Sequence, residues 1–505
     1  MEKKDTLIDI TLTFVCLLVI FWLHTKTFIN WDVAWHVEGA GRLLNGGTYL
    51  VNMFDTNAPL VFSYFFPVIW LKGISGLSFP QLINSYMVIT NVIPLLLSYR
   101  IINQTFNDDL IRKKFLYYTV VFILLFLPAF NFGHREMILI EFYLPYYLSA
   151  IFTTAYQKNF NKWQTYLIAA LGAYGIAQNI FYLCIPVLLD LYSYIKVKKT
   201  APGSLIFYLS TIAFALLTIF IYPEYVKYII PMILQYESGF NFPWSVLLLE
   251  VLTFVSLTAM VITILNFKKF CSNYHIVMTF IAAFLSLTIY FLERKLWYYH
   301  FYPALSFVVL LLIFIILKFY EELKSATVKT GNLITVSLAA GILLTIMMTL
   351  IGFTKDELFL FKNPSSVENR WIHYAETHFL NKKVFFFVIE LRPAHSLPLY
   401  LDNKIKIVSP WSNPWILPYI ILHQTNMSPS LVRDVSMFQN FTTQALINEQ
   451  PDFLVIENTP QALTYRSGPF NYVSFFMQNK NFVEFFRNYE IYDHFDSFTI
   501  YKKYK

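Results

Sequence analysis

The chain has 505 residues, of which 57% are hydrophobic and only 14% charged. Soluble domains are about a quarter charged, so this composition excludes an ordinary soluble protein and predicts a polytopic α-helical membrane protein. The net charge of +7 does not indicate nucleic-acid binding, because the basic residues lie in short clusters between apolar runs, as in cytoplasmic loops. Cys16, Cys184 and Cys271 lie within or beside apolar runs, which favours neither a disulfide framework nor a zinc finger.

Eleven apolar runs are candidates for helices that cross a bilayer, each of which needs about 20 residues. They are Leu7–Leu23, Leu82–Ile102, Phe115–Phe130, Met137–Tyr156, Trp163–Ala177, Ile180–Ile195, Ser204–Tyr222, Trp244–Leu265, Ile276–Leu292, Phe301–Leu317 and Leu333–Phe353. The run Pro59–Leu71 is short and contains Pro67, so we expect either a twelfth span or a helix lying at the membrane surface. No small-residue cleavage site follows the first run, which we interpret as an uncleaved helix.

The distribution of basic residues orients the chain. If Pro59–Leu71 stays on the outer face, alternate loops hold 16 lysines and arginines, against 7 in the other loops before the tail. Basic loops stay in the cytoplasm, so we place the N-terminus there and everything after Phe353 outside. We therefore predict a transmembrane domain at 1–353, with a first outer loop at 24–80, and an extracytoplasmic domain at 354–505.

The tail has the pattern of a small α/β domain. Ser366–Leu380 reads as a helix that Ser366 can cap. Val384–Ile389, Lys404–Val408 and Phe453–Ile456 read as short buried strands, and Ile491–Lys502 as a terminal strand or hairpin. Strands that alternate with helical stretches are typical of an α/β domain.

This topology gathers ionisable residues on the outer face. Such groups are costly near hydrocarbon, so they usually face a cavity and have a function there. They are Asp32, His36, Glu38, Arg42 and Asp55 in the first loop; His134, Arg135, Glu136 and Glu141 after the third span; Glu224, Lys227 and Glu237 after the seventh; and Glu293, Arg294, Lys295 and His300 after the ninth.

Asp32 follows the first span directly and lies between Trp31 and Trp35. A loop aspartate is often only a helix N-cap, but this position favours a functional role. On a helix, Asp32 and His36 share one face at i, i+4, which suits a general base with an orienting partner or two metal ligands. We take Asp32, His36 and Glu38 as catalytic candidates. No strong ligand spacing supports a metal, and a divalent ion stays an open alternative.

Four basic residues are candidates for gripping a lipid phosphate: Arg135, Arg294, Lys295 and His300. They lie on the outer face, where few cations are expected, and the guanidinium fork suits phosphate. The alternative is a border of snorkelling cations within an aromatic belt. Asp55, Glu136 and Glu141 are further acidic candidates for the site.

Two short motifs follow Asp32 in the first loop. Gly46-Gly47-Thr48-Tyr49 is similar to a Gly-x-x-Tyr step, and Asn57-Ala58-Pro59-Leu60 to a Lys-Pro-Pro-Leu segment, in which Asn57 replaces the lysine. With the early aspartate, the multi-span bundle and the outer α/β tail, the chain resembles the GT-C glycosyltransferases. The resemblance is strongest to the group of aminoarabinose transferases and protein mannosyltransferases.

The resemblance implies sugar transfer, with inversion, from a polyprenyl-phosphate-linked donor to a lipid, glycan or protein acceptor on the outer face of a bacterial inner membrane. In this interpretation Asp32 takes the acceptor proton and the basic candidates hold the leaving phosphate. A transporter or flippase would instead place charges near the bilayer midplane and interrupt related helices. A polysaccharide polymerase or ligase, using the same donors, remains a further alternative. A scaffold protein would leave the charged clusters unexplained.

Overall fold

The computed structural model describes residues 2–158, 160–324, 330–388, 392–411, 414–458 and 470–504. Packing divides the chain into two compact units. The first, here called the helical unit, comprises Met1–Phe28, Asn84–Leu216 and Phe242–Leu358. The second, the sheet unit, comprises Ile29–Ile83, Leu217–Asn241 and Phe359–Lys505. Segment Ile29–Ile83, which contains most of the predicted first loop, therefore packs with the C-terminal segment, although more than 270 residues separate them.

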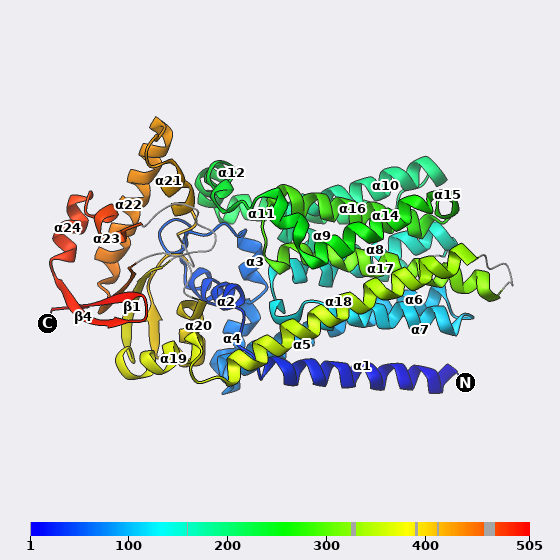
Figure 1. The fold of residues 1–505 in the computed structure, drawn as a ribbon, viewed down its shortest axis with the longest axis horizontal. Coiled ribbons are helices and arrows are strands. Elements are labelled where there is room, and N and C mark those ends of the chain that lie inside the picture. Colours follow the sequence, from blue (N-terminus) through cyan, green and yellow to red (C-terminus); the bar gives the residue numbers. More distant parts are fainter. Residues whose placement is uncertain are drawn as a thin grey trace. The chain divides into compact units, whose positions relative to one another are not determined.

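The helical unit is a bundle in which α8, α9, α16 and α17 run side by side (Figure 1). In both α8 and α17, 89% of the most apolar 18-residue segment is buried. The elements are α1 (Glu2–His24), α6 (Val92–Thr105), α7 (Leu110–Val121), the π-helix η1 (Phe122–Phe126), η2 (Ala129–Asn131), α8 (Arg135–Tyr156), α9 (Lys162–Gln178), η3 (Ile180–Leu183), α10 (Cys184–Val197), α13 (Trp244–Leu249), α14 (Val251–Leu265), α15 (Phe267–Phe270), α16 (Tyr274–Glu293) and α17 (Tyr298–Lys324). Helices α5 (Phe79–Thr90), α11 (Ser204–Ile221) and α18 (Thr330–Lys362) contribute residues to both units.

Within the described ranges, eight helices are long and apolar enough to cross a membrane. They coincide with eight of the predicted runs and confirm a multi-pass membrane protein. The other three runs fall short for local reasons. Helix α9 has 17 residues. Helix α7 gives way to the π-helix at Phe122, before Pro128. The run from Trp244 is broken at Glu250, whose backbone is extended between α13 and α14.

The predicted juxtamembrane run is two short helices, α3 (Pro59–Ser63) and α4 (Phe66–Ser75). Pro67 lies in the first turn of α4, where a proline costs no hydrogen bond. Both helices pack on α2 (Trp31–Leu44) within the sheet unit. Each helix is shorter than the about 20 residues that a span needs. The choice between the two predicted alternatives stays a prediction.

The sheet unit carries a five-stranded sheet in the order β2-β1-β3-β5-β4. The strands are β1 (Lys382–Phe387), β2 (Ile405–Ile407), β3 (Phe453–Glu457), β4 (Tyr489–Phe495) and β5 (Phe498–Lys503). Strand β1 pairs in parallel with β2 and β3, whereas β5 is antiparallel to β3 and β4. The predicted buried strands and the terminal hairpin are confirmed.

Helices surround this sheet. Ser366 caps α19, its Oγ accepting from the Asn369 amide at 3.3 Å, as predicted. Trp371 of α19 is fully buried in the core beside β1 and β3. The remaining elements of the unit are α12 (Ile230–Tyr236), η4 (Tyr225–Ile229), η5 (Glu237–Phe240), α19 (Val367–His378), α20 (Arg392–Tyr400), α21 (Leu417–His423), α22 (Pro429–Glu449), α23 (Tyr472–Phe476) and α24 (Lys480–Phe486). Helix α20 packs on α2, which ties the first loop to the sheet.

Candidate active site

Asp32 lies in the first turn of α2 rather than at its cap. The cap is Asn30, whose Oδ1 accepts from the Asp32 amide at 2.9 Å. The simple N-cap alternative for Asp32 is therefore wrong. A carboxylate in the first turn is favoured by the helix dipole, and the Asp32 side chain is half-buried. Helix α2 begins at Trp31 because Asn30, a favourable N-cap residue, directly precedes the amphipathic run.

Asp55 is buried and is held by two neutral donors. Trp35 Nε1 donates to Oδ2 at 2.6 Å, and the Asn57 amide donates to Oδ1 at 2.6 Å. Burial raises the pKa of Asp55 to about 6, the two hydrogen bonds oppose that rise, and the charge of Asp32 adds to it. The two carboxylates therefore interact electrostatically. Trp35 and Asp32 both lie on α2, so one helix carries one carboxylate and positions the other.

Two tyrosines brace the backbone that follows Asp55. The Tyr49 hydroxyl donates to the carbonyl of Asn57 at 2.9 Å, and the Tyr225 hydroxyl donates to the carbonyl of Thr56 at 3.0 Å. Their rings pack edge to face at 5.1 Å. Tyr49 ends the Gly-x-x-Tyr step, so the physical role of that motif here is to fix the segment that carries Asp55.

His36 and Glu38 make structural contacts. The buried His36 ring packs against Phe62 of α3 and against Phe65, with centroids 5.6 and 6.1 Å away. Glu38 pairs with Arg42 one turn later, Oε1 to Nε at 3.1 Å. Catalytic roles for His36 and Glu38 stay predictions.

Arg42 ties α2 to the sheet. Its guanidinium donates to the carbonyls of Asn52, Ile407 and Ser409 at 2.7–2.9 Å. It also stacks on the Trp35 ring, 5.0 Å from the centroid. The same indole therefore contacts Arg42 and holds Asp55.

The helical unit contains a second cluster at the start of α8. Arg135 Nε donates to Glu136 Oε1 at 2.7 Å, and His134 Nδ1 lies 2.6 Å from Glu136 Oε2. Glu136 is completely buried. The His134 ring stacks on Tyr299 with 3.7 Å between centroids.

A second carboxylate–histidine pair joins this cluster. His300 Nδ1 lies 2.6 Å from Glu293 Oε2 and 3.9 Å from Glu136 Oε1. Asn179 Nδ2 donates to Glu293 Oε1 at 3.4 Å. The structure thus brings the predicted Arg135, Glu136 and His300 together and adds His134, Glu293 and Asn179. His134 and Glu293 lie in the outer-face charge clusters, the only sequence signal for them, whereas nothing marked Asn179.

The other candidates of this unit lie differently. Arg294 adopts a left-handed conformation that ends α16, donates from Nε to the carbonyl of Phe242 at 3.0 Å, and stacks on Trp244. Lys295 is buried, with Nζ 6.0 Å from the centre of the Trp297 ring. Glu141 is buried within α8. Arg294 therefore fastens a loop, and phosphate-binding roles for Arg294 and Lys295 stay predictions.

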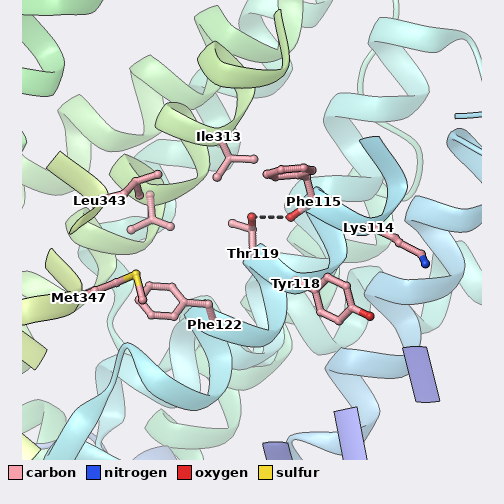
Figure 2. Close-up of a pocket in the computed structure, with 9 residues that line it drawn as sticks. Lys114, Phe115, Tyr118, Thr119, Phe122, Ile313, Leu343 and Met347 are labelled. Atoms are coloured by element: carbon pink, nitrogen blue, oxygen red, sulfur yellow. Dashed lines mark hydrogen bonds between the residues drawn. The ribbon is translucent and has the colours of Figure 1, made fainter. Parts of the chain in front are cut away.

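Among the residues that the structure describes, no group of three or more histidine, cysteine, aspartate or glutamate side chains is arranged to hold a metal ion. An apolar pocket of about 340 Å³ lies in the helical unit. Figure 2 shows it between α7 and η1 on one side and α17 and α18 on the other, with Phe115, Phe122, Ile313 and Met347 among its lining. None of the predicted site residues lines it.

Comparison with known proteins identifies the fold. No family model and no curated protein sequence matches the chain. Among solved structures, the chain is similar to the crystal structure of ArnT from Cupriavidus metallidurans in the apo state, with a TM-score of 0.51 and 12% identity over 97% of each chain. The chain therefore shares its fold with that structure over nearly its whole length.

Proposed function

We propose that this protein is an integral-membrane glycosyltransferase that moves a sugar from a polyprenyl-phosphate-linked donor to an acceptor on the outer face of a bacterial inner membrane. The observation that carries the proposal is the carboxylate pair of Asp32 and Asp55, anchored on α2 in a chain with the ArnT fold. A general base must reach the acceptor hydroxyl and have a proton affinity suited to neutral pH. Asp32 is half-buried beside a carboxylate whose pKa is about 6.

In the proposed reaction the acceptor hydroxyl attacks the anomeric carbon as its proton passes to Asp32. The bond between that carbon and the phosphate oxygen breaks, and the polyprenyl phosphate leaves with the electron pair. Attack opposite the leaving group inverts the anomeric centre. Asp55 keeps negative charge near Asp32, which favours protonation of the Asp32 carboxylate during attack.

Within the helical unit, the cluster around Arg135 is our candidate for binding a phosphate. Arg135 faces two carboxylates, Glu136 and Glu293. His134 and His300 each direct Nδ1 to a carboxylate, and imidazole nitrogens are a kind of group that can hydrogen-bond phosphate oxygens.

The test is a transfer assay with the purified full chain in lipid nanodiscs. Radiolabelled polyprenyl-phosphate sugars are supplied with membrane extract as the acceptor source, and released polyprenyl phosphate is measured. We expect release that depends on the acceptor. A transporter would instead move the donor across the bilayer of proteoliposomes without cleaving it, and that result would overturn the proposal.

A further inference from the structure

The sheet unit contains a pocket, lined by both polar and apolar side chains, that the proposed reaction does not use. It has a volume of about 570 Å³ and lies between the second half of α2, the edge strand β2 and the C-terminal end of α22. The side chains that give it polar character are Glu38, Arg42, Asn45, Asn52, Asn403, Lys406, Asn448 and Glu449. Glu38 lies on α2, six residues after Asp32. One end of the pocket is therefore formed by the helix that carries the proposed base.

This pocket continues into a second hollow along α22. The second hollow has a volume of about 630 Å³, and Val51 and Ala445 line both. The α22 residues of the two pockets recur every three or four positions, so they form one face of the helix. They are Arg433, Ser436, Met437, Asn440, Phe441, Gln444, Ala445, Asn448 and Glu449. At 1.5 Å per residue, this face extends for about 24 Å between Arg433 and Glu449. We call the combined surface the α22 groove.

The charges of the α22 groove are paired. Glu38 contacts Arg42 at 3.1 Å. Glu449 contacts Lys383 and Lys406 at 3.1 and 3.4 Å, and Arg433 contacts Asp434 at 3.1 Å. A surface with paired charges of both signs has little preference for a polyanion. The groove therefore lacks the electrostatic signature of a phosphate-rich or acidic ligand.

Amide side chains supply most of the remaining polar lining. A carboxamide can make up to about four hydrogen bonds, as donor and as acceptor. Gln444 Nε2 donates to Asn448 Oδ1 at 2.8 Å, which uses one bonding position on each. Groups that both donate and accept match sugar hydroxyls, which do the same. The apolar pocket of Figure 2, in contrast, has the lining expected for hydrocarbon.

Arg42 occupies part of this edge of the sheet. Strand β2 is an outer strand, and unpaired outer strands can accept an extended peptide. Here the Arg42 guanidinium occupies the carbonyl of Ile407 on β2 and that of Ser409 beyond it, at 2.9 and 2.7 Å. The groove therefore presents side-chain amides beside a partly occupied strand edge.

We propose that the α22 groove binds an extended, uncharged glycan chain, which leads to the acceptor hydroxyl at Asp32. This inference rests on the proposed function and specifies its acceptor as a glycan rather than a lipid or a protein. A length of about 24 Å accommodates several successive sugars, so affinity should rise with oligosaccharide length until the groove is filled.

The experiment uses the purified full chain in nanodiscs on a printed array. The array carries neutral oligosaccharides of increasing length, uronate-containing oligosaccharides and serine/threonine-rich peptides. We expect binding to neutral oligosaccharides that strengthens with length. The double variant Gln444→Leu/Asn448→Leu should weaken it by about tenfold, as expected for the loss of two hydrogen bonds. The matched control is Gln424→Leu/Asn426→Leu, an exposed amide pair outside both pockets, which should bind as the parent does.

The inference is overturned if neutral oligosaccharides are not bound, if the groove variant binds them as the control does, or if uronates or peptides are preferred. Transfer assays keep this result separate from the proposed function. Acceptor-dependent donor cleavage without neutral-glycan binding would retain the transferase and remove the groove inference. Length-dependent glycan binding without any donor cleavage would retain glycan binding by the groove and remove the proposed transferase activity.

Discussion

Asp55 and Glu136 are both buried carboxylates, but their environments differ. Asp55 accepts from an indole and a backbone amide, both neutral, so burial dominates and raises its pKa to about 6. Glu136 contacts a guanidinium and two imidazoles, which can carry positive charge. Neutral donors leave a carboxylate able to exchange protons near neutral pH, whereas cations compensate its charge. The first environment suits acid–base chemistry and the second suits the binding of charged groups.

The largest effect should come from Asp32→Asn. This change keeps the side-chain shape and removes the base, which typically contributes about 10²- to 10⁴-fold in rate. We expect donor cleavage to fall by about that factor while donor binding is retained, measured by release of labelled polyprenyl phosphate. Asp402→Asn, at an exposed aspartate of the same unit, serves as the control. Parental activity in the Asp32 variant, with normal expression, would contradict the assigned base.

Variants of Arg135 can distinguish a structural role of the Arg135–Glu136 cluster from a role in donor binding. Arg135→Gln leaves the buried Glu136 without its guanidinium, and breaking such a pair typically costs about 3–5 kcal/mol. The unfolding midpoint should therefore drop strongly. The double variant Arg135→Gln/Glu136→Gln should recover most of this loss but still bind the donor poorly. Recovery of both stability and donor binding would show that the cluster has only a structural role.

Asp55 should give the sheet unit a pH-dependent stability. Its pKa is about 6 in the folded chain, against an ordinary 3.8, so the folded state binds the proton more tightly than the unfolded state. This contribution is full below pH 3.8 and is lost as pH rises through about 6, a difference of about 3 kcal/mol. Asp55→Asn should therefore flatten the decline of the unfolding midpoint between about pH 4 and 6, followed by thermal melts. The same variant should lose transfer activity, because the amide carries no charge beside Asp32.

Local patterns were sufficient to predict much of the fold. A few consecutive residues are enough to predict each buried strand and the Ser366 cap, and the structure contains them. Two predicted spans are interrupted, one by the π-helix that begins at Phe122 and the other at Glu250, a charged residue inside an apolar run. Hydropathy averaged over a run does not register such a single residue.

The candidate site depends on contacts between residues far apart in the sequence, which local patterns cannot predict. Arg135 and Glu136 are adjacent, so their pairing could be anticipated. The Trp35 indole reaches Asp55 across 20 positions, and Arg42 reaches Ile407 across 365. Periodicity within one helix cannot specify such pairs. The sequence therefore identified Asp55 as a candidate but not the neutral donors that set its pKa.

The smallest expected effect sharpens the role of the Gly-x-x-Tyr step. Tyr49→Phe removes only the hydroxyl that donates to the carbonyl of Asn57, a hydrogen bond worth about 1 kcal/mol. The segment after Asp55 should loosen slightly, and the transfer rate should fall by less than about tenfold. Tyr222→Phe is the matched control, since the Tyr222 ring packs on Tyr49 at 5.9 Å but is not part of this brace. Equal rates for the two variants would mean that the ring of Tyr49, and not its hydroxyl, holds Asp55 in place.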